Sequence, residues 1–152
     1  MSTILPMRVL SLLLLLCPLC HAESVKVLVL NGNNGQALSG VPVSVHFIYD
    51  KPANAMPPLL LTTSSEGEAE FSLPSSAPER IGVQISLDYY ACDCWMLAET
   101  KTILPKGVLS KFHGQKVKSG VSLQPGQITF LPRPFTLMER FMLRLVNAFR
   151  VH

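Results

Sequence analysis

The sequence predicts an all-β fold, a seven-stranded antiparallel β-sandwich that ends in one amphipathic α-helix. Residues 41–47 and 68–73 place apolar side chains at every second position, which is the period of a strand with one buried face. The segment Ser-Ser-Glu-Gly at residues 64–67 precedes the second of these stretches, and Gly67 permits the backbone to reverse there. After residue 134 the apolar period lengthens from two to about 3.6, which indicates a helix.

The N-terminal 22 residues have the pattern of a secretory signal peptide. Arg8 supplies a positive charge, residues 9–16 form a short apolar run, and Cys20-His21-Ala22 offers small residues at a cleavage site. The run is too short for a membrane-spanning helix. An uncleaved anchor is one alternative, and a lipoprotein signal at Cys17 or Cys20 is another, although Leu precedes both cysteines where a small residue is preferred. We expect cleavage after Ala22 and no spanning segment in the mature chain.

Seven strands are predicted in order along the mature chain. Each is a run of alternating or continuous apolar residues bounded by turn-forming residues. The expected strands span residues 23–30, 41–48, 59–63, 68–73, 80–87, 98–104 and 127–131. Residues 105–120, which are rich in lysine, are predicted to form a basic excursion between strands. The inward-facing positions predict a core that includes Val43, Val45, Phe71, Val83 and Ile85.

The C-terminal segment, residues 132–152, is predicted to hold an amphipathic helix over residues 136–150. Thr136 is the expected N-cap, and Glu139 three residues later completes a capping box. Apolar residues occupy one half of the helix and arginines the other, which is typical of a membrane-interface helix or of a helix that docks on a partner. The alternative is a terminal helix packed on its own sandwich. The expected contact residues are Leu137, Arg140, Phe141, Arg144, Leu145, Phe149 and Arg150.

The charges are distributed unevenly along the chain. Residues 23–99 contain three basic and nine acidic residues, whereas residues 100–152 contain nine basic residues and one acid, Glu139. Such asymmetry is typical of a basic tail that meets an anionic surface, such as an anionic membrane. It is equally compatible with an acidic sandwich face and a solvated basic edge.

Two cysteines, Cys92 and Cys94, remain after removal of the signal peptide. In an exported protein we expect a disulfide, either local or between molecules. The functional alternative is a redox or soft-metal site at these two thiols, with His113 as a third ligand.

Known catalytic motifs are missing from the sequence. It contains no G-x-S-x-G elbow, no H-E-x-x-H pair, no P-loop and no S-x-x-K motif. The lysines lack the interleaved aromatic residues of a nucleic-acid-binding surface. The sequence therefore predicts a protein that is not an enzyme, requires no cofactor and binds no nucleic acid.

The order G-Q-A-L-S-G-V-P-V-S-V, then a gap, then T-T-S-S-E-G-E-A-E-F resembles the carboxypeptidase regulatory-like domain. That family belongs with the transthyretin-like (prealbumin-like) and Cna B-type β-sandwiches, and the resemblance covers residues 25–87. It implies a seven-stranded sandwich over residues 23–131 that serves as a non-catalytic module in exported proteins.

These observations lead to the hypothesis that the protein is an exported module, either secreted or periplasmic, that serves in binding or structural support at the cell envelope. If the C-terminal helix contacts lipid, the module would be peripheral to a membrane. Its expected partner is an envelope protein, a glycan or an anionic membrane surface. The alternative is a small redox or metal-handling envelope protein that uses Cys92 and Cys94.

Overall fold

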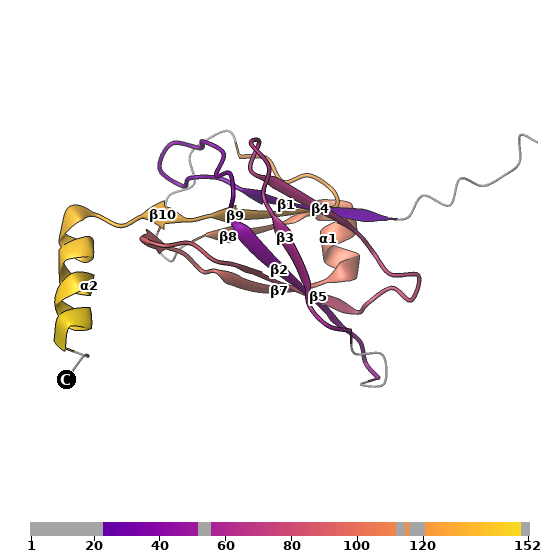
Figure 1. Cartoon of the computed structure of the whole chain (residues 1–152). Helices are drawn as coiled ribbons and strands as arrows, with labels where there is room; N and C mark the ends of the chain where they lie inside the picture. The colour runs from indigo at the N-terminus through magenta and orange to yellow at the C-terminus, as the bar shows by residue number, and fades with distance from the viewer. Residues whose placement is uncertain (1–22, 52–55, 112–114, 116–120, 150–152) are drawn as a thin grey trace, which may run out of the picture.

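The computed structural model describes residues 23–51, 56–111, 115 and 121–149 (Figure 1). The predicted signal peptide therefore lies outside the described residues. The strands of the described chain form two four-stranded sheets and a two-stranded ribbon, and two helices complete the structure. The first sheet has the order β4 (Glu68–Ser72), β1 (Ser24–Val29), β9 (Gln127–Leu131), β8 (Val108–Lys111). The second has the order β3 (Leu59–Thr62), β2 (Pro42–Ile48), β5 (Arg80–Ile85), β7 (Trp95–Glu99).

The ribbon and the helices lie at the ends of these sheets. β10 (Arg133–Pro134) pairs antiparallel with β6 (Tyr90–Ala91), which extends the β-structure past residue 131, the predicted boundary. The helix α1 (Thr100–Lys106) connects β7 in the second sheet to β8 in the first, and α2 (Leu137–Phe149) ends the described chain. We refer to residues 23–134 as the two-sheet body.

The hydrophobic core lies between the two sheets because apolar side chains alternate along the strands of both. Val25, Val27 and Val29 of β1 are fully buried, and they belong to the same cluster as the inward-facing residues of β2 and β5. Phe47 and Phe71 join the sheets directly, with ring centroids 5.8 Å apart in an edge-to-face contact. The predicted core is confirmed, since Val43, Val45, Phe71, Val83 and Ile85 are all buried.

Gly67 makes the predicted turn before β4 and has a positive φ of 75°. Its carbonyl accepts a hydrogen bond from the Val29 N–H at 2.9 Å, so the turn packs against the end of β1. A Cβ atom at this position would lie 2.6 Å from the carbonyl oxygen of Val29. Both the backbone conformation and the close approach therefore require glycine.

The prediction of a purely antiparallel sandwich was wrong for the first sheet. β9 lies between β1 and β8 and runs parallel to both, with Val27 opposite Ile128 and Ser110 opposite Phe130. All five residues of β9 are buried, as is usual for a strand with parallel neighbours on both sides. Alternation within a strand predicts which face is buried, but it does not determine the direction of the neighbouring strand.

The prediction for residues 98–120 was also wrong in two places. The expected strand at 98–104 is the end of β7 followed by α1, in which Ile103 is fully buried. Gly107, with φ 68°, ends this helix and donates its N–H to the Ile103 carbonyl at 2.8 Å. The segment expected to be a basic excursion contains β8, and the short strand β6 was not predicted. Short apolar runs do not distinguish helix from strand, and tertiary pairing decides between them here.

Candidate functional site

The first turn of α2 is held by a capping box between Thr136 and Glu139. The Glu139 carboxylate accepts hydrogen bonds from the Thr136 N–H at 2.7 Å and from its hydroxyl at 2.9 Å. The Thr136 oxygen accepts the Glu139 N–H at 3.3 Å. The predicted capping box is thereby confirmed, and the helix starts within one residue of the expected position.

A second contact fixes the same carboxylate to the two-sheet body. Arg133 of β10 donates from both terminal nitrogens to Glu139, with Nη2–Oε1 at 2.7 Å and Nη1–Oε2 at 3.0 Å. The Arg133 guanidinium, followed by the two Thr136 donors, lowers the pKa of Glu139 to about 2. Sequence reasoning found the cap but missed Arg133. Arg133 and Glu139 lie on opposite sides of a strand-to-helix turn, so their separation in the sequence matches the period of neither a strand nor a helix.

Arg140 of α2 approaches the two-sheet body at Tyr89. The Arg140 guanidinium carbon lies 6.0 Å from the centroid of the Tyr89 ring, at the outer limit of a cation–π contact. Tyr89 has a positive φ of 64°, and its carbonyl accepts the Phe135 N–H at 2.8 Å just before the helix. Arg140 therefore lies on the side of α2 that is nearest Tyr89, and its side chain stays exposed.

The apolar residues of α2 are exposed along all the turns whose side chains are described. In Figure 1 the helix lies beyond the end of the sheets, joined to them through β10. Within the described chain, no other helix or strand makes extensive contact with α2. Exposed fractions range from 38% for Leu145 to 86% for Leu137. The exposed apolar residues of the helix are Leu137, Met138, Phe141, Met142, Leu143, Leu145 and Val146.

Five of the seven predicted contact residues have described side chains, and these five share the exposed helix. Leu137, Phe141 and Leu145 lie on its apolar side, and Arg140 and Arg144 lie on its polar side. The side chain of Phe149 and the whole of Arg150 lie outside the described part of the chain. Neither described helix is long and apolar enough to cross a membrane.

Cys92 and Cys94 are joined as a disulfide in the connection between β6 and β7, with Cα atoms 5.0 Å apart. The carbonyl of Asp93, between them, accepts the Ser110 hydroxyl of β8 at 2.8 Å. Among the described residues, no group of three His, Cys, Asp or Glu side chains is placed to hold a metal ion. His113, the third ligand considered in the metal hypothesis, lies outside the described residues.

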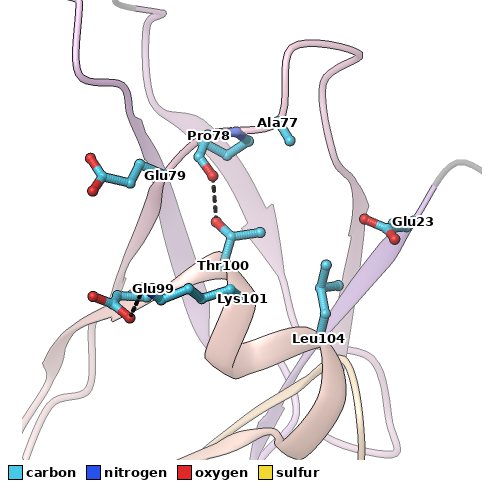
Figure 2. Close-up of a pocket in the computed structure, with 8 residues that line it drawn as sticks. All are labelled: Glu23, Ala77, Pro78, Glu79, Glu99, Thr100, Lys101 and Leu104. Carbon is cyan, nitrogen blue, oxygen red and sulfur yellow. Dashed lines mark hydrogen bonds and ion pairs between the residues drawn. The ribbon is translucent and has the colours of Figure 1, made fainter.

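A cavity of about 310 Å³ lies where α1 meets the loop before β5 (Figure 2). Its apolar lining comes from Ala77, Pro78 and Leu104. The Thr100 hydroxyl donates to the Pro78 carbonyl at 2.6 Å and closes one side. The lining residues are Glu23, Ala77, Pro78, Glu79, Glu99, Thr100, Lys101 and Leu104.

The charged groups around this cavity interact with one another. Lys101 Nζ lies 3.3 Å from a Glu99 carboxylate oxygen. A hydrogen bond with the Asp50 carboxyl, together with its negative charge, raises the pKa of Glu79. The charged groups among the eight lining residues are three glutamates and one lysine. The arrangement therefore gives an apolar recess with a mainly acidic rim.

The strongest candidate for a functional surface in the described chain is thus α2, a helix fixed to the body at its first turn and exposed along its apolar side.

The chain matches no protein-family model, no curated protein and no solved structure.

Proposed function

We propose that this chain is an exported, non-enzymatic β-sandwich module of the carboxypeptidase regulatory-like type, and that α2 attaches it to an anionic membrane surface. The observation that carries the proposal is the exposed apolar side of α2. Arg140 approaches Tyr89 of the body while its side chain stays exposed, and the apolar residues of the helix are exposed to solvent rather than packed on the body. A terminal helix that completed its own core would bury that side instead.

The charges of α2 favour an anionic lipid surface as the occupant of its apolar side. Glu139 is the one acidic residue of the segment, and Arg133 pairs with it. Arg140 and Arg144 lie on the polar side of the helix, and each would add roughly 1 kcal/mol where it comes near anionic lipid. An interfacial helix buries its apolar side a few ångströms into the headgroup boundary, and this segment combines a wide apolar side with a basic polar one.

The attachment at the first turn suits a peripheral anchor. The ion pair and the capping box determine where α2 leaves the body, so the helix does not depend on lipid for its starting direction. Its axis lies across the direction of the strands in Figure 1. With α2 flat in the membrane interface, the two sheets would extend away from the surface and leave their faces open to other ligands.

Vesicle sedimentation of the mature chain, residues 23–152, tests this proposal. We expect binding to vesicles of phosphatidylcholine and phosphatidylglycerol in equal parts, and much weaker binding to phosphatidylcholine alone. The double variant Phe141→Glu, Leu145→Glu should abolish binding because it places two charges on the apolar side. The matched control is Leu60→Glu in β3, at another exposed apolar residue (75% exposed), and it should bind like the unmodified chain.

Two results would overturn the proposal. One is equal binding by the double variant and the unmodified chain. The other is that the unmodified chain forms a dimer in solution, the double variant is a monomer, and neither protein binds vesicles. In that case α2 would dock on a second copy of the chain. Binding to both vesicle types alike would reject the electrostatic contribution of Arg140 and Arg144.

A further inference from the structure

The outer face of the second sheet is open to solvent and carries the one tryptophan of the chain. Trp95 of β7 pairs in register with Gln84 of β5, Gln84 lies beside Ser44 of β2, and Ser44 lies beside Leu60 of β3. These four residues alternate with the inward-facing core positions, so their side chains form one row across the whole sheet. Trp95 is 43% exposed and Leu60 is 75% exposed.

The indole of Trp95 lies across the sheet because Gly82 leaves room for it. A Cβ atom at Gly82 would lie 2.7 Å from Cη2 of the Trp95 ring, so any side chain there would displace the ring. On the far side of Gly82 the ring meets His46 of β2, with centroids 5.3 Å apart and an interplanar angle of 66°. The indole therefore extends from β7 over β5 to β2, with one side against the sheet and the other toward solvent.

A recess of about 290 Å³ lies beside this row, over the ends of β2 and β3. Three hydroxyl groups line it, those of Ser44, Thr62 and Ser86, together with the exposed Leu60. Ser44 also links the recess to the tryptophan, since its Oγ lies 3.1 Å from Nε2 of His46. The residues that line this recess include no Asp, Glu, Lys or Arg.

We propose that this face binds a neutral oligosaccharide. The apolar C–H face of a sugar ring would lie on the indole of Trp95, and its hydroxyls would bond to Ser44, Thr62, Ser86 and the Gln84 amide. The recess is just below the range of about 300–1,000 Å³ for small-molecule pockets, which suits one sugar unit with the rest of the chain over Trp95. An anionic ligand would call for Arg or Lys in the lining, and these are missing from it.

This binding face is separate from α2 and does not rest on the proposed membrane attachment. None of the residues that form it belongs to the helix or to its contacts with the body. In combination, the two features would hold a glycan-binding face at a membrane surface, but each is tested independently of the other.

Because Trp95 is the chain's one tryptophan, its fluorescence reports on this face alone. The test is a titration of the mature chain with chitotetraose, cellotetraose and maltotetraose. We expect a saturable change in tryptophan emission with at least one of the three. Isothermal titration calorimetry should then show binding about tenfold or more weaker in Trp95→Ala, which removes the stacking surface. Gly82→Ala should shift the emission of the free protein and weaken binding, because it displaces the indole while leaving every polar group in place.

Matched variants separate this site from effects on folding and from α2. Trp95→Phe keeps an aromatic surface and should retain part of the affinity, and thermal unfolding of each variant shows that it is folded. Phe141→Glu, Leu145→Glu should bind the oligosaccharide like the unmodified chain. Absence of binding to all three neutral tetrasaccharides would overturn the proposal, as would unchanged affinity in a folded Trp95→Ala. Binding of a heparin tetrasaccharide in place of the neutral ones would also overturn it.

Discussion

Arg133 and Glu139 form a two-point ion pair across the turn between β10 and α2, with N–O distances of 2.7 and 3.0 Å. The same carboxylate closes the capping box with Thr136. One side chain therefore starts the helix and ties it to the body. This pair matters because no other helix or strand of the described chain makes extensive contact with α2. The position of the helix therefore depends on this pair, on the Phe135 N–H bonded to the Tyr89 carbonyl, and on Arg140 beside the Tyr89 ring.

The first prediction concerns the pH dependence of this attachment. The pKa of Glu139 is lowered from 4.5 to about 2 in the folded chain. A lowered carboxyl pKa stabilises the folded arrangement above pH 4.5, and this contribution is lost as the pH falls through about 2. A carbon-13 NMR titration of the Glu139 carboxyl should show this value, and Arg133→Ala should raise it toward 4.5. A midpoint near 4.5 in the unmodified chain would contradict the ion pair.

The second prediction concerns the core between the sheets. Phe71 is 5% exposed and packs on Phe47, so Phe71→Ala should lower the free energy of unfolding by about 3–5 kcal/mol. Phe141→Ala in α2 is the control, because that ring is 57% exposed and its loss should change the free energy by about 0.5 kcal/mol or less. Urea denaturation measures both. Equal stabilities for the two variants would mean that Phe71 does not join the sheets.

The third prediction separates backbone strain from steric conflict at two turn glycines. Gly35 and Gly67 have nearly the same φ, 76° and 75°. A Cβ atom at Gly35 would meet nothing within 4 Å, whereas one at Gly67 would lie 2.6 Å from the Val29 carbonyl oxygen. Gly35→Ala should therefore cost about 1 kcal/mol of strain, and Gly67→Ala clearly more. Thermal unfolding of the two variants side by side shows which loses more stability. A larger loss of stability in Gly35→Ala than in Gly67→Ala would contradict the steric conflict at Gly67.

The fourth prediction concerns processing of the N-terminus. β1 begins at Ser24, so cleavage after Ala22 leaves the whole strand in the mature chain. Intact mass of the protein recovered from an exporting host should correspond to a chain that starts at Glu23. A lipid-modified Cys20, or a chain that retains Met1, would show that the signal-peptide prediction is wrong.

The fifth prediction concerns the two mature cysteines. Because Cys92 and Cys94 are joined in the structure, neither should react with a thiol reagent until a reductant is added, and two thiols per chain should react afterwards. Free thiols in the protein as isolated, together with stoichiometric uptake of Zn(II) or Cu(I), would instead favour the redox or metal-handling alternative.

Much of the local structure of this chain is determined by short-range chemistry, and the sequence alone predicts it. The alternation at residues 41–47 and 68–73 predicted β2, β4 and their buried faces, because a strand side chain has only two directions to point. Thr136 and Glu139 predicted the start of α2, since a capping box satisfies backbone donors within one turn.

The tertiary structure alone decided the features that depend on contacts between distant segments. β9 runs parallel between β1 and β8. Residues 100–106 form a helix that buries Ile103, although their apolar pattern also suits a strand. Gly82 and Trp95 come together through the register of β5 and β7, which no spacing in the sequence reveals. Periodicity determines which side of an element is buried, but the partner of that side is selected by the packing of the whole chain.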